Sequence, residues 1–271
     1  MTEAGEAALA GWLAGRRVLV AYGLFGEASP AVRLLGLDYM GAQQDWLRRM
    51  GALPEVVRVP TADSVAGNAA TLREALLAEE RPALVLAHSK GGLEALEALL
   101  DPNAAAHCAG LIALQSPFAG SAVADAVMRR WVPRRLALGA VRLLGFGTGE
   151  GVRDLTTAAR ATWMQEHGGA VAALLQQLPV VTAAAVLSRG DRVQWREWPW
   201  AMARRWLERR AGPNDGLVPL ASALLPGARQ MVERGSHIAL VVTGDGRDPV
   251  GALRRALALL LQPPAPDVPF S

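Results

Sequence analysis

Short apolar runs alternate with amphipathic segments along most of this chain of 271 residues. Buried strands are predicted where an apolar run is bounded by glycine, proline or polar turn residues, as at 17–22, 54–59, 82–86, 110–115, 180–187 and 228–232. Helices are predicted from the patterns between these runs, at 6–13, 39–49, 64–80, 93–100 and 251–261. Strands that alternate with helices at this spacing form a mostly parallel sheet with helices on both faces. Ligands bind such sheets at the carboxyl ends of the strands, where Gly23, Ser89 and Ser116 are expected to lie.

The composition favours a single domain that covers residues 1–271. Apolar residues make up 51% of the chain, which is enough for a substantial core. All apolar runs are shorter than the roughly eighteen residues that cross a bilayer. The acidic start Met1–Glu6 lacks the basic and apolar regions of a secretory signal. Cys108 is the only cysteine, so no internal disulfide can form, and these features together predict a cytoplasmic protein.

The charge pattern argues against a nucleic-acid partner. The formal net charge is +3, and the arginines are scattered among acidic residues without a module that combines aromatic and basic side chains. Lys90 is the sole lysine of the chain. We therefore expect a small-molecule or lipid-like substrate and no nucleic acid.

A serine at a sharp turn is the first feature that points to chemistry. The sequence Ala87-His88-Ser89-Lys90-Gly91-Gly92 follows the apolar run 82–86 and precedes the helical pattern 93–100. Small residues at 87 and 91 let the strand and helix backbones approach closely at a strained turn. A serine in this setting forms a nucleophile elbow, in which its hydroxyl points into a cleft. Ala87 replaces the usual first glycine and keeps the position small.

A serine hydroxyl needs a base that removes its proton, and four histidines are available. His237 is predicted to be this base, because it follows the strand at 228–232 on a short loop before the last helix. His88 adjoins the serine, and its side chain is expected to point away from the cleft side of the turn as structural support. His107 and His167 are expected to be solvated or packed.

The base in turn needs a carboxylate that orients it. Asp215, in the turn Pro213–Pro219, is predicted to accept the hydrogen on Nδ1 of His237 and so to fix its tautomer. Asp191, after the strand at 180–187, is the competing candidate. An Asp-Gly turn taken alone is more often only a turn. The chain order of serine, aspartate and histidine favours Asp215.

Two backbone N–H groups are expected to stabilise the negative oxygen that forms when the serine attacks a carbonyl. Lys90, the residue after the serine, supplies the first group. Leu24, in the turn Tyr22-Gly23-Leu24-Phe25-Gly26, is predicted to supply the second, with Phe25 as the alternative. Gly23 lets this turn approach a substrate carbonyl closely.

Two segments interrupt the alternation of strands and helices. Residues 122–178 contain a glycine-rich joint at 145–151 and are interpreted as a helical cap over the cleft. The alternative is that these helices pack at the sheet edge. An insertion at 192–212 holds a cluster of aromatic residues, Trp195, Trp198, Trp200 and Trp206. Packing on the sheet edge is the favoured interpretation of this cluster, and the alternatives are an acyl pocket or a membrane-surface contact through 195–206.

With these residues identified, the chain resembles the α/β-hydrolase superfamily and, within it, the bacterial triacylglycerol lipases and esterases. The resemblance covers roughly residues 17–260 and rests on 22–26, 88–92, 116–121, 153–157 and 214–218, together with His237. It implies an α/β-hydrolase fold, with a mostly parallel central sheet, helices on both faces and an inserted helical cap. Gly23, Phe25 and Phe118 are the residues expected to contact the substrate. Tyr22 and Phe118 replace histidines that such lipases often carry beside the cleft.

The resemblance also raises the question of a metal. Many secreted lipases of this kind hold a calcium ion between two aspartates. Asp191 is near one of these positions, but Ala239 stands at the other. We therefore expect no metal and no organic cofactor.

The combined interpretation is a serine carboxylic-ester hydrolase that acts on an apolar acyl ester through Ser89, His237 and Asp215. An acyltransferase would use the same three side chains and is one alternative. The departures at Ala87 and Tyr22 leave a second alternative, a binding protein that retains the fold without catalysis.

Overall fold

A computed structural model describes residues 3–24, 39–129, 150–191, 197–244 and 246–263. Its centre is a six-stranded sheet in the order β2-β1-β3-β4-β5-β6, in which every neighbouring pair is parallel. The strands are β1 (Arg17–Ala21), β2 (Leu53–Val56), β3 (Ala83–His88), β4 (Cys108–Leu114), β5 (Val180–Val186) and β6 (Arg229–Arg234). The predicted parallel sheet is confirmed.

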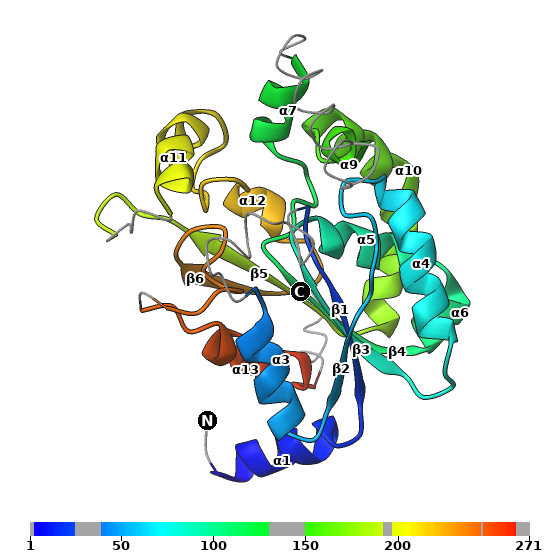
Figure 1. Cartoon of the computed structure of the whole chain (residues 1–271). Helices are drawn as coiled ribbons and strands as arrows, with labels where there is room; N and C mark the ends of the chain where they lie inside the picture. The colour runs from blue at the N-terminus through cyan, green and yellow to red at the C-terminus, as the bar shows by residue number, and fades with distance from the viewer. Residues whose placement is uncertain (1–2, 25–38, 130–149, 192–196, 245, 264–271) are drawn as a thin grey trace, which may run out of the picture.

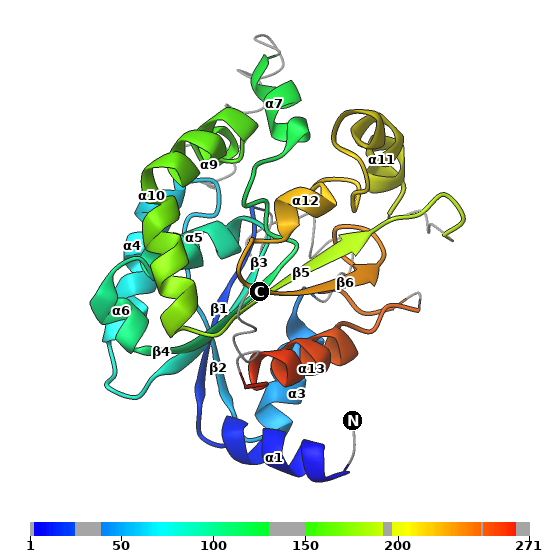
Figure 2. The same cartoon turned by 180° about the vertical axis from the view of Figure 1, so that it is seen from behind.

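Helices cover both faces of this sheet, as Figures 1 and 2 show. One face packs against α4 (Val65–Leu77), α5 (Lys90–Ala98) and the second half of α10 (Thr157–Gln177). The other face packs against α1 (Glu3–Leu13), α3 (Gly41–Arg49) and α13 (Pro249–Leu260). Alternate residues of the central strands enter the two cores. In β3, for example, Val85 and Ala87 face α5, whereas Leu84 and Leu86 face the opposite layer.

The segment predicted as a cap has two different parts. Its described helices are α7 (Ala122–Arg129), α9 (Glu150–Asp154) and α10, and residues 130–149, with most of the glycine-rich joint, lie outside the described residues. Val171 and Leu174 of α10 are buried in the same core as α5. Two neighbouring parallel strands need a crossover connection, which is usually a helix. The second half of α10 therefore serves as the crossover helix between β4 and β5.

The Trp-rich insertion forms α11 (Trp198–Ala211), which contacts α7, and Trp195 lies in the undescribed stretch 192–196. Leu207 anchors α11 in the protein, whereas Trp198 and Met202 are 63% and 60% exposed. The short helices α6 (Pro102–Ala106) and α12 (Leu220–Ala223) complete the described elements. No helix in the described part of the chain is both long and apolar enough to span a bilayer.

Two boundaries near the turn at Ser89 differ from the sequence-based prediction. The helix after the serine begins at Lys90 and not at Leu93. Gly91 and Gly92, which were expected to belong to the turn, lie within the first turn of this helix. The strand β3 continues through His88 to the turn itself. Strand and helix therefore meet at Ser89 with no intervening loop, which fixes the direction of its side chain.

Candidate active site

Ser89 occupies a strained backbone turn between β3 and α5. Its φ is 54° and its ψ is −124°, a conformation that is costly for a residue with a side chain. A β-carbon at Gly91 would collide with the carbonyl oxygen of Ala21, and one at Gly23 would lie 2.7 Å from the β-carbon of Ser89. These contacts explain the small residues around the serine. They also place the loop after β1 directly beside its hydroxyl.

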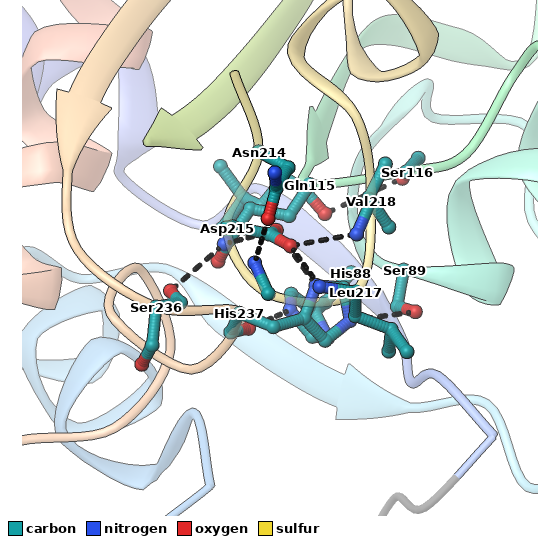
Figure 3. A network of polar contacts seen from close by, with 12 residues as sticks. His88, Ser89, Gln115, Ser116, Asn214, Asp215, Leu217, Val218, Ser236 and His237 are labelled. Atoms are coloured by element: carbon teal, nitrogen blue, oxygen red, sulfur yellow. Dashed lines mark hydrogen bonds and ion pairs between the residues drawn. The ribbon is translucent and has the colours of Figure 1, made fainter. Parts of the chain in front are cut away.

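The hydroxyl of Ser89, the imidazole of His237 and the carboxylate of Asp215 form one line of hydrogen bonds (Figure 3). Nε2 of His237 lies 3.1 Å from Oγ of Ser89, and Nδ1 lies 2.8 Å from Oδ2 of Asp215. Asp215 comes from the turn before α12, and His237 comes from the loop after β6. All three residues are at least nine-tenths buried. The fold thus joins side chains that lie far apart in the sequence.

The carboxylate of Asp215 is held by N–H donors on both oxygens. Oδ1 accepts from the backbone N–H groups of Leu217 and Val218 at 2.9 and 2.7 Å. Oδ2 accepts from His237 and also from Nε2 of Gln115, each at 2.8 Å. These donors offset the cost of burying the charge. They also fix which oxygen faces the imidazole.

Gln115 is a site residue that the sequence analysis missed. It follows β4 with a φ of 51°, and its Nε2 donates both to Asp215 and, at 3.0 Å, to the carbonyl oxygen of Ser236. A single buried amide therefore links the carboxylate to the loop that carries His237. A glutamine after a strand has no sequence signal for this role, since its partners lie 100 and 121 positions away.

The competing candidates for acid and base lie in other surroundings. Asp191 accepts from the backbone N–H of Ser188 and pairs with Arg234. His107 bonds to a carbonyl oxygen within α6, and His167 stacks on Trp163 in α10. In the described ranges, no group of three or more His, Cys, Asp or Glu side chains is arranged to hold a metal ion.

The predicted donors to a negative oxygen flank Ser89. Lys90 is the first residue of α5, so its backbone N–H belongs to the helix terminus next to the hydroxyl. Leu24 follows Gly23, which lies against Ser89. Phe25 lies outside the described residues. Phe118 is 2% exposed and packs in the core beside α5. Its contact with a substrate, like that of Gly23, stays a prediction.

The side chain of Lys90 points away from the hydroxyl into the protein. Its ammonium group, with no exposed surface, pairs with Glu94 one turn along α5, and Glu94 also accepts from Asn68 of α4 at 2.7 Å. Burial raises the pKa of Glu94, although the positive charge of Lys90 acts in the opposite direction. The sole lysine thus ties the first turn of α5 to a neighbouring helix.

Replacing Lys90 with methionine is expected to destabilise the protein by about 3–5 kcal/mol, because Glu94 would remain buried without its cation. The measurement is urea unfolding of the variant and the wild type. The double variant Lys90→Met/Glu94→Leu removes both charges and should recover most of the loss. A single variant as stable as the wild type would contradict a structural role for the ion pair.

The sheet order, the elbow and the helical layers define an α/β-hydrolase fold. No family model and no curated protein sequence matches the chain. Among solved structures, the mature lipase of Bacillus licheniformis is 22% identical, with a TM-score of 0.62 over 83% of this chain and 85% of its own. A metagenomic carboxyl esterase is also 22% identical, with a TM-score of 0.68 over 91% of this chain and 74% of its own.

A more distant likeness links the chain to phospholipase PlaB of Legionella pneumophila. The identity is 15% and the TM-score is 0.53, over 90% of this chain and 60% of that protein. At these identities the comparisons establish the fold. The resemblance to α/β-hydrolases in the sequence is confirmed at this level.

Proposed function

We propose that the protein is a serine carboxylic-ester hydrolase whose substrates carry an apolar acyl group. The observation that carries this proposal is the unbroken line from Asp215 through His237 to Ser89, with the serine at a strained elbow. In such a network the carboxylate orients the imidazole, and the imidazole removes the proton of the serine hydroxyl and so makes it a nucleophile. The fold neighbours include proteins named as a lipase and a carboxyl esterase, which supports the same class of reaction.

In the proposed mechanism, Oγ of Ser89 attacks the ester carbonyl while Nε2 of His237 takes the hydroxyl proton. Asp215 accepts the hydrogen on Nδ1 and stabilises the imidazolium that forms. The backbone N–H groups of Leu24 and Lys90 donate to the oxygen that becomes negative. His237 then gives its proton to the departing alcohol, which leaves an acyl group on Ser89. Water, activated by the same imidazole, releases the acid and restores the serine.

A fluorophosphonate probe tests this proposal directly, because only an activated serine reacts with it rapidly. The folded protein is expected to gain one label, located by mass spectrometry on the peptide that contains Ser89, and to hydrolyse p-nitrophenyl butyrate. Heat-unfolded protein is the control and should gain no label. A folded protein that neither reacts with the probe nor hydrolyses the ester would overturn the proposal and favour a non-catalytic binding role.

Product analysis in the presence of a competing alcohol distinguishes hydrolysis from acyl transfer. A hydrolase is expected to give mainly the free acid when the alcohol is present at millimolar concentration. Predominant formation of the new ester would assign the protein to the acyltransferases instead.

A further inference from the structure

His88, the residue before the nucleophile, is enclosed between Tyr39 and His237. It is 2% exposed, and its ring centroid lies 5.4 Å from that of Tyr39 and 4.9 Å from that of His237. Nδ1 of His88 is hydrogen-bonded to the hydroxyl of Tyr39, and Nε2 lies 3.1 Å from the carbonyl oxygen of His237. Both ring nitrogens are therefore engaged by groups on other parts of the chain.

The chemistry of these groups fixes the direction of the hydrogen bonds. A carbonyl oxygen can only accept, so Nε2 of His88 carries the hydrogen. In the neutral ring Nδ1 is then an acceptor, and the hydroxyl of Tyr39 must donate to it. Burial raises the pKa of the Tyr39 hydroxyl, and the backbone N–H of Gly23 acts in the opposite direction, as a nearby donor does. Two hydrogen bonds thus run in one direction, from Tyr39 through His88 to the carbonyl oxygen of His237, and Gly23 lies on the Tyr39 side of this relay.

The charge state of His88 agrees with this direction. Burial, and then the neighbouring His237, lower the pKa of His88 well below its usual range. The ring is therefore neutral near pH 7. A second proton would fall on Nδ1, against the hydroxyl of Tyr39, and would add a positive charge next to the imidazole of the predicted base.

We propose that Tyr39 and His88 are positioning residues that hold the loop after β1 and the backbone of His237 in a fixed relation to Ser89. This inference rests on the proposed function, because the two ends of the relay are the predicted oxyanion loop and the predicted base. The N–H of Gly23 acts on the hydroxyl of Tyr39 at the start of the relay. The next N–H along the loop, that of Leu24, is then the group left to face a substrate oxygen. Neither Tyr39 nor His88 touches the reacting atoms.

Tyr39→Phe tests the relay, because it removes one hydroxyl and keeps the ring. With p-nitrophenyl butyrate as substrate, kcat is expected to fall about tenfold, since small displacements of catalytic groups have effects of this order. The KM is expected to stay within about twofold, because the lost bonds act on groups that work in the transition state. A purely structural role would instead lower the melting temperature and leave kcat per folded molecule unchanged.

A matched control lies at the far end of the sheet. Arg17, at the start of β1, is buried, donates to the carbonyl oxygen of Ala75 and pairs with Glu55 and Glu79. Arg17→Met therefore also removes a buried polar contact, and it is expected to lower the melting temperature with kcat within twofold of the wild type. An equal fall in kcat for both variants would show a general response to destabilisation and would refute the relay.

NMR spectroscopy gives a readout that does not require catalysis. In protein that carries Ser89→Ala, the ¹⁵N resonances of His88 should show a protonated Nε2 and an Nδ1 that accepts a hydrogen bond. Adding Tyr39→Phe should move the Nδ1 resonance toward that of a free acceptor and speed hydrogen exchange at the amide of Gly23. Adding Arg17→Met should change neither signal.

The outcomes separate the relay from the proposed function. A hydrogen on Nδ1 of His88 in the unmodified relay would overturn the assigned direction, and so would a Gly23 amide that is unaffected by Tyr39→Phe. If Tyr39→Phe changes the Nδ1 resonance of His88 and the exchange rate of the Gly23 amide but keeps kcat within twofold, the hydrogen bonds do not position the catalytic groups. An inactive wild type that retains the NMR signals would count against the ester hydrolase and leave the hydrogen-bond relay established.

Discussion

Replacement of Ser89 with alanine is expected to lower kcat for p-nitrophenyl butyrate by at least about a thousandfold. Without Oγ there is no nucleophile for His237 to activate, and only the N–H donors and substrate binding remain to accelerate attack by water. The smaller side chain fits the strained turn, because it keeps the β-carbon and removes one atom. The melting temperature should therefore stay close to that of the wild type. Initial rates and circular dichroism of both proteins are the measurements.

The matched control for this variant is Ser64→Ala. Ser64 caps α4 by accepting the backbone N–H of Gly67 at 3.1 Å, so its loss costs about 1 kcal/mol of stability. The kcat of the Ser64→Ala variant is expected to equal that of the wild type. Hydrolysis that persists in Ser89→Ala at more than about a tenth of the wild-type rate would remove Ser89 from the mechanism.

Replacement of Asp215 with asparagine is expected to lower kcat by about ten-thousandfold through the wrong histidine tautomer. The N–H groups of Leu217 and Val218 require the amide oxygen of the asparagine at the Oδ1 position. Its NH₂ group then faces Nδ1 of His237, which must become an acceptor. The imidazole hydrogen moves to Nε2, so that nitrogen cannot take the proton of Ser89. Steady-state kinetics gives the loss, and ¹⁵N resonances of His237 give the tautomer.

Asp191→Asn is the control for this second change, because Asp191 was the rival candidate for the acid. Its carboxylate bonds to the backbone of Ser188 and to Arg234 near the surface. Activity within twofold of the wild type is expected. If Asp191→Asn were the damaging change and Asp215→Asn the harmless one, the acid would have to be reassigned.

Much of the fold could be predicted from local patterns. The strands β1, β3, β4 and β5 are apolar runs, because a central parallel strand is buried on both faces. The order of Ser89, Asp215 and His237 along the chain led to three side chains that the structure brings together. Their catalytic roles stay predictions until the variants are measured.

What could not be predicted depends on contacts between distant side chains. Gln115 and Tyr39 carry no local signal, since each acts through atoms that only the folded chain brings near. The sequence also did not show that residues 122–178 include a helix that packs on the central sheet. A helical pattern does not tell whether the helix covers a sheet, as the end of α10 does, or lies elsewhere. The burial of Val171 and Leu174 decides this only in three dimensions.

The burial of Lys90 affects how the surface charge of the molecule changes with pH. Because the one ammonium side chain has no exposed surface, every permanently cationic side chain that solvent reaches is a guanidinium. Guanidinium groups keep their proton far into the alkaline range, where surface amines would lose theirs. The positive part of the surface charge is therefore nearly constant between neutral and strongly alkaline solution, and the net charge changes there mainly through phenolic, thiol, imidazole and terminal amino groups.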